Sequence, residues 1–160
     1  MNPDKFKADL AQTGVLPIQR SLEEWLNGRL GPEAPLVLEW IKALRSGKYA
    51  QGEGYLRAGD AYCCLGVLCE VAEVPKVEKD LSIVEYDGKV PKVEKDFSIV
   101  EYDGKIFNLP LGMTIRLQMC PNGRFSGTSY SLAGFNDEWG FTFNEIADVI
   151  ESYPHLLFYN

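Results

Sequence analysis

The chain has 160 residues and a formal net charge of −7, with a calculated isoelectric point near 4.8. Its length favours a single domain with one hydrophobic core, which we assign to residues 1–160. Hydrophobic residues make up 46% of the chain and charged residues 24%, proportions that exclude a disordered or fibrous protein. The excess of acidic side chains disfavours direct binding of nucleic acid.

The sequence carries no signal for a membrane span or for secretion. Its longest apolar run, residues 65–69, is far too short to cross a bilayer, and its first residues lack an apolar signal segment. We therefore expect a cytoplasmic protein. Disulfides are rare in a reducing cytoplasm, so we expect the four cysteines to act as small buried side chains.

Three helices are predicted in the first third of the chain. Asn2 precedes a proline and an acidic residue, which is typical of a helix start, and this helix should end near Gln12. The capping box at residues 21–24 opens a second helix. Residues 1–34 thus form a helical N-terminal extension. A third, amphipathic helix follows from Pro35 to Gly47.

The next segment combines a glycine-rich link with a strongly apolar helix. A short strand is expected at residues 55–57 within the link. Asp60 should then cap a helix over residues 61–72. Because this helix is apolar on nearly every side, we expect it to be the buried central element of the fold.

Residues 74–105 are a tandem duplication of a 16-residue unit, with Leu81 in the first copy replaced by Phe97 in the second. Each copy contains a strand pattern followed by Asp-Gly, the preferred type I′ hairpin turn. Only the second copy leads into a plausible return strand, since a proline follows the first. We therefore assign the native hairpin to the second copy and treat the first as an insert at the sheet edge.

The last third is predicted to be helical again. Short helices are expected over residues 110–117 and after Ser131, and the capping box at residues 142–145 opens the final helix. Together these elements predict an α+β fold, mostly helical, around a buried central helix with a small antiparallel β-hairpin sheet.

One enzymatic hypothesis rests on Cys63 and Cys64. Both are expected in the first turn of a helix, where the helix dipole lowers the pKa of a thiol. Such a nucleophile needs a histidine base, and the only histidine, His155, has no spacing that ties it to the cysteines. Structural cysteines are the favoured interpretation.

Neither a metal nor another cofactor is predicted. The cysteine and histidine spacing does not match a zinc site. The acidic segment around Asn136 and Asp137 fails the EF-hand pattern, because Gly140 stands at the wrong distance.

The glycine-rich link is the best candidate for a binding site. Exposed backbone N–H groups, an aromatic ring and an arginine lie just before a helix N-terminus, an arrangement that suits an anion such as phosphate. The residues concerned are Gln51, Gly52, Gly54, Tyr55 and Arg57. They match neither a P-loop nor a dinucleotide-binding motif, and a tight structural turn is the alternative.

Several segments together carry a resemblance to a known family. They are Trp40–Arg57, Tyr62–Glu70, Asn108–Pro110, Ser131–Asp137 and Phe143–Ile150. In these residues the chain resembles a family of small proteins encoded by tailed bacteriophages, over about residues 38–151. The resemblance implies a protein made in the cytoplasm of an infected bacterium and absent from the virion. The N-terminal extension and the duplication depart from the family pattern.

Small accessory phage proteins often counter host defence. With this expectation we consider three functional hypotheses. The first is a non-catalytic binder that sequesters a small nucleotide-like anion or a host defence protein, using residues 51–57 with Asn136 and Asp137. The second is a cysteine-dependent hydrolase or transferase. The third is an acidic nucleic-acid mimic, since residues 125–160 contain no lysine or arginine. A homo-oligomer is considered with each.

Overall fold

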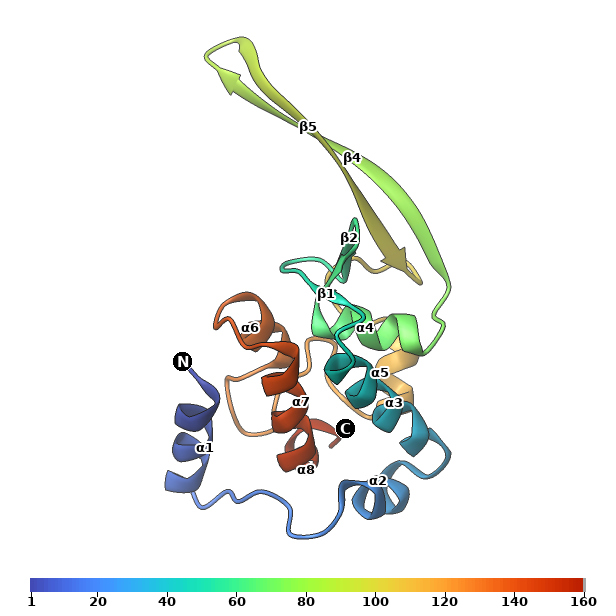
Figure 1. Cartoon of the computed structure of the whole chain (residues 1–160), viewed down its shortest axis with the longest axis vertical. Coiled ribbons are helices and arrows are strands. Elements are labelled where there is room, and N and C mark those ends of the chain that lie inside the picture. Colours follow the sequence, from blue (N-terminus) through green and yellow to red (C-terminus); the bar gives the residue numbers. More distant parts are fainter. Residues whose placement is uncertain (160) are drawn as a thin grey trace.

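The computed structural model describes residues 1–159, including all their side chains except those of residues 83–87 and 91–96. Figure 1 shows a body of helices from which a long two-stranded ribbon projects. The helices are α1 (Pro3–Gln12), α2 (Leu22–Leu30), α3 (Ala34–Arg45), α4 (Cys64–Val71), α5 (Leu111–Leu117), α6 (Leu132–Asp137), α7 (Phe143–Ser152) and α8 (Pro154–Leu157), with a 3₁₀ turn over Gly31–Glu33. The strands are β1 (Ala50–Gln51), β2 (Arg57–Ala58), β3 (Ala61–Tyr62), β4 (Lys76–Asp87) and β5 (Val90–Tyr102).

Most helices begin where side-chain caps satisfy their first N–H groups. The side chain of Asn2 accepts from the backbone of Lys5 at the start of α1, and Ser131 does the same for α6. At α7 both halves of the Thr142–Glu145 capping box are formed. These local hydrogen bonds confirm the predicted starts of the three helices, because a cap involves only residues three apart.

The central helix is buried as predicted, but it starts later. Residues 64–69 of α4 are all buried. The cap is Cys63, whose sulfur accepts from the backbone of Gly66, and not Asp60. Ala61 and Tyr62 instead form strand β3, because β1 and β2 supply hydrogen-bonding partners on either side of it. Tertiary strand pairing thus overrides the local helix signal.

The sheet has five strands in the order β1-β3-β2-β5-β4 and is mixed, since β1 and β3 are parallel. The expectation of a simple antiparallel hairpin sheet is therefore wrong in detail, although the α+β class is confirmed. Strand β2 joins the three short strands to the ribbon by pairing Ala58 with Ile99.

The two copies of the duplicated unit pair with each other. Strand β4 lies in the first copy and β5 in the second, and they run antiparallel with Leu81 opposite Phe97. The predicted assignment of the hairpin to the second copy alone is wrong. Residues 105–109 form no strand and follow a tight turn closed by an isolated bridge between Tyr102 and Lys105. Pairing between the two units is more favourable than a hairpin within the second unit, because it forms a ladder along all twelve residues of β4.

One hydrophobic cluster runs through the helical body. It includes Phe6 from α1, Trp40 from α3, most of α4, and Phe158 near the end of the described chain. The indole N–H of Trp40 donates to the carbonyl of Cys64 at 2.9 Å, which fixes α3 against the start of α4. Within residues 1–159, the helices lack the length and apolar character needed to span a membrane.

Candidate functional site

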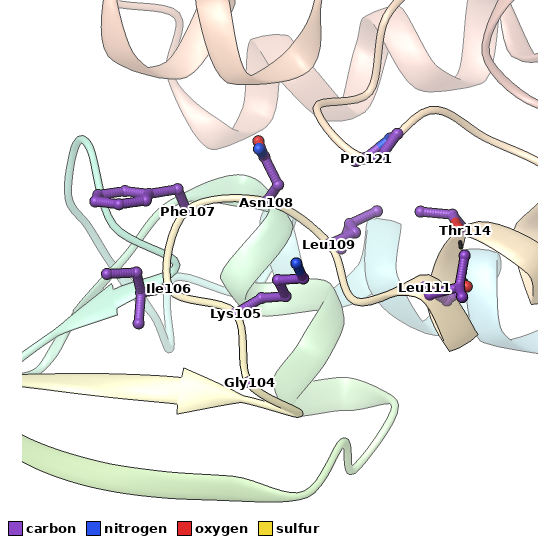
Figure 2. Close-up of a pocket in the computed structure, with 9 residues that line it drawn as sticks. All are labelled: Gly104, Lys105, Ile106, Phe107, Asn108, Leu109, Leu111, Thr114 and Pro121. Atoms are coloured by element: carbon purple, nitrogen blue, oxygen red, sulfur yellow. Dashed lines mark hydrogen bonds between the residues drawn. The ribbon is translucent and has the colours of Figure 1, made fainter.

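A groove opens where the ribbon joins α5. It has a volume of about 650 Å³ and lies between the loop of residues 104–109, the start of α5 and Pro121 (Figure 2). The loop is held from both sides, because Ile106 accepts a backbone hydrogen bond from Leu56 and Leu109 donates one to Pro121. The walls of the groove are therefore anchored to the core by backbone contacts.

Two residues that line the groove, Phe107 and Leu111, expose apolar side chains to solvent, and Ile115 extends this exposed surface along α5. Phe107 is 54% exposed, and Leu111 and Ile115 on α5 are 70% and 67% exposed. Leu111 and Ile115 are four residues apart and so share one face of the helix. Large exposed apolar side chains are unremarkable when scattered, but a group of them beside a groove is typical of a binding surface. We call Phe107, Leu111 and Ile115 with the groove the apolar groove surface.

Tyr55 packs against the Phe107 side chain of this surface. Its ring stacks on Phe107, with the ring centroids 5.2 Å apart and the planes at 29°, and it also contacts Phe97 of β5 at 5.9 Å. Tyr55 is the one residue of the predicted anion site that the structure places beside the groove. Its role there is aromatic packing and not contact with an anion.

Four of the other predicted site residues, Gln51, Gly52, Asn136 and Asp137, take part in a partly buried hydrogen-bond network. The side-chain amide of Gln51 donates to Asn136, whose own amide donates to the carbonyl of Gly52 at 2.7 Å. Asn136 also contacts Asp137, and its oxygen accepts the backbone N–H of Cys64 at 3.2 Å. Four of the predicted residues are thus brought together, but the first N–H of α4 is already satisfied within the protein. This arrangement leaves the helix N-terminus closed to an anion.

Arg57 lies in a separate polar cluster. Its guanidinium group sits 5.0 Å from the centroid of the Tyr62 ring, and its Nε donates to the carbonyl of Gly59. Nearby, the hydroxyl of Tyr102 donates to Glu70, which also accepts from Lys76. Arg57 is therefore committed to internal contacts. Gly54 stands apart from these contacts as a turn residue, with φ at +83°.

Cys63 and Cys64 lie in surroundings that do not activate a thiol nucleophile. Cys63 and Cys64 are both buried, and burial raises the pKa of the Cys63 thiol to about 11 and that of Cys64 well above its usual value. Desolvation outweighs the helix dipole because the thiolate would lie among apolar side chains. His155 lies on α8, which Figure 1 places away from α4, with its ring against Tyr153. Neither thiol is therefore activated.

No group of three His, Cys, Asp or Glu side chains suited to a metal ion occurs among the described residues. The acidic side chains of α7 are partly neutralised, since Arg45 makes 2.8 Å ion pairs with Asp148 and Glu151. These ion pairs weaken the case for a continuous anionic surface that imitates nucleic acid.

The sequence prediction missed the apolar groove surface. The sequence predicts a return strand after the second Asp-Gly turn, over residues 105–109, and in such a strand Phe107 would be an ordinary sheet residue. A usable signal was present in the short helix after Pro110. Leu111 and Ile115 lie on one face of it and Met113 and Leu117 on another. A seven-residue helix on a surface cannot bury both faces.

Comparison with known proteins assigns the chain to a family whose function is unknown. Residues 36–154 match the model of a domain of unknown function, DUF8296. The match covers most of the chain, which therefore belongs to this family. No curated protein and no solved structure is significantly similar to the chain.

Proposed function

We propose that this member of the DUF8296 family is a non-catalytic binding protein that uses the apolar groove surface to hold a segment of a protein partner. The observation that supports this most directly is the exposure of Phe107 and Leu111, which line one groove, together with Ile115 on the same face of α5 as Leu111. Burial of such side chains is the main favourable term in protein association.

The chemistry of the groove favours a protein over a nucleotide. Its lining residues include a single charged side chain, Lys105, beside Ile106, Phe107, Leu109, Leu111 and Pro121. A nucleotide needs several convergent donors for its phosphates. We infer a partner segment that presents an aliphatic or aromatic side chain, which would enter the groove between Phe107 and Leu111.

The resemblance to tailed-bacteriophage proteins extends the proposal to the biological setting. We propose that the partner is a host protein of an infected bacterium, and that binding counters a host defence. The small-anion version of this hypothesis has lost its physical basis, because Gln51, Asn136 and Arg57 are engaged in internal contacts.

A photo-crosslinking experiment tests the proposal. A photoreactive amino acid replaces Thr114, which lines the groove and is half-buried, in the full chain expressed in infected bacteria. We expect one host protein to be crosslinked. Leu111→Asp should weaken binding of that protein about thirtyfold, since burying a leucine side chain contributes about 2 kcal/mol.

Leu16→Asp is the matched control, because Leu16 is a comparably exposed leucine outside the groove. It should leave crosslinking unchanged. Equal loss with both variants, or equal capture with both, would contradict the groove as the binding site. Release of a nucleotide from the denatured protein, without any crosslinked partner, would instead favour a small-ligand binder.

A further inference from the structure

The ribbon of β4 and β5, residues 76–102, is a second surface that the proposed function does not use. We call it the arm. Figure 1 shows it extending away from the helical body, and β2 contacts it near its base through the pairing of Ala58 with Ile99. Strand β4 is the last strand in the order of the described sheet. The outer edge of this twelve-residue strand therefore has no neighbouring strand in the described sheet, and a further strand could pair with it.

The hydrogen-bonding direction along β4 follows from its neighbours. The backbone of Gly59 in the loop after β2 donates to the carbonyl of Ser98, so the backbone groups of Ser98 point toward β2. Asp80 lies opposite Ser98, in a pair without mutual hydrogen bonds. The N–H and C=O groups of Asp80 therefore point outward along the available edge of β4.

The sequence of the unit is complementary to a second copy of itself. In the arm, the unit positions from Lys76 to Glu85 pair with the positions that mirror them about Leu81 and Phe97, and the register shifts by one residue beyond Glu85. This pairing places no like charges directly opposite each other, and it forms an ion pair between Lys79 and Glu101. The arm is thus a direct demonstration that one unit accepts another as an antiparallel partner.

We propose that two copies of this chain associate through their arms, with β4 antiparallel to β4 of the second copy and Leu81 opposite Leu81. In that register the outward N–H and C=O groups of Asp80 form backbone hydrogen bonds with β4 of the second copy. The product is a continuous four-stranded sheet made of two arms. This surface is independent of the apolar groove surface.

Two properties of β4 favour this edge over that of β5. An isolated two-stranded ribbon is marginally stable in water, so additional strands would stabilise the arm. Strand β4 contains no proline, whereas Pro91 near the tip of β5 lacks an N–H group. Val77 on β4 is also 58% exposed, and the second arm would cover it.

Sedimentation equilibrium of the full chain tests the proposal. We expect a reversible monomer–dimer equilibrium. Asp80→Pro removes an outward N–H while leaving the bonds between β4 and β5 in place. Because the two-fold axis doubles the loss, the dissociation constant of the dimer should rise about tenfold or more. Asp80→Ala is the matched control, since it removes the same side chain and keeps the N–H.

The outcomes separate cleanly. Weakened association for Asp80→Pro together with near-native association for Asp80→Ala supports the pairing of β4 with β4. A monomeric wild-type protein at every concentration overturns it. Equal dimerisation of both variants also overturns it, because the dimer then uses another surface. Circular dichroism of each variant verifies that the arm is still paired.

Discussion

At the scale of single residues, Gly66 has the most demanding position in the central helix. A Cβ atom there would lie 1.7 Å from the carbonyl oxygen of Leu56, so the loop before β2 packs directly on the α4 backbone. This close approach explains why glycine is tolerated inside a helix, where it ordinarily destabilises. The contact also positions Tyr55, which stacks on Phe107 beside the groove.

We expect Gly66→Ala to lower the free energy of unfolding by about 3 kcal/mol, because either α4 or the Leu56 loop must move. Urea denaturation followed by tryptophan fluorescence measures the loss. Gly112→Ala is the control, since nothing lies within 4 Å of its Cβ position and it sits within α5. That variant should be unchanged or slightly more stable. Equal stability of both variants would contradict the close packing.

The buried thiol of Cys63 makes stability depend on alkaline pH. Burial raises its pKa from 9.0 to about 11 in the folded protein. The unfolded chain therefore loses this proton first, and the stabilisation present below pH 9 is lost as the pH rises toward 11. The Cys63 contribution should amount to about 2–3 kcal/mol across this window.

Cys63→Ser isolates that contribution. Serine retains an N-cap acceptor for the backbone of Gly66 but does not titrate in this range. We expect the variant to lose less stability than wild type between pH 9 and 11, measured by urea denaturation at each pH. Parallel curves for the two proteins would show that the thiol is not buried in the folded state. Rapid labelling of Cys63 by a thiol reagent at neutral pH would agree with that result and revive the nucleophile hypothesis.

At the scale of elements, the duplication lengthens a hairpin without changing its base. Removing residues 74–89 or residues 80–95 produces the same sequence, because the copies are identical up to position 81. The shortened chain keeps the four strand pairs from Lys76–Tyr102 to Lys79–Ile99. Phe97 then lies in the turn of a short hairpin. One unit thus adds about 26 Å of ribbon, at about 3.3 Å per residue.

We therefore expect deletion of residues 80–95 to change the free energy of unfolding by less than about 1 kcal/mol, since few contacts with the helical body are lost. Ile99→Ala, at the base of the arm, should cost about 2–4 kcal/mol because its side chain is buried. Thermal denaturation of the two variants makes the comparison. A large loss on deletion would show that the distal arm stabilises the body.

At the scale of the whole molecule, the N-terminal helix is part of the core even though the family match begins at residue 36. Phe6 is fully buried, and its ring lies within 5.6 Å of four other aromatic rings, measured between centroids. These rings are those of Phe125, Tyr130, Phe135 and Tyr153. The extension therefore closes a side of the body built by α6, α7 and the loop before them.

Phe6→Ala should accordingly lower the free energy of unfolding by about 4 kcal/mol, the cost of a cavity the size of a phenyl ring. Leu16→Ala, an exposed position between α1 and α2, should have little effect. Urea denaturation of both variants tests the difference. If Phe6→Ala were as stable as wild type, the extension would be an appendage that packs weakly on the body.

The sequence by itself determined the features that depend on neighbouring residues. The caps at Asn2, Ser131 and Thr142, the apolar central helix and the α+β class all follow from signals within one turn or one hydrophobic pattern. These signals suffice because the hydrogen bonds involved join residues three or four apart.

Only the tertiary structure decided how distant segments combine. The two copies have nearly the same local preferences, so their pairing depends on a ladder that no local pattern specifies. Gln51 and Asn136 are 85 residues apart, and the tertiary structure brings them into a hydrogen bond with each other. This internal bond occupies side chains that the sequence analysis assigned to an anion site. The exposure of Phe107, Leu111 and Ile115 is likewise a result of packing. The helical body buries one face of α5, and the other face remains in solvent beside the groove.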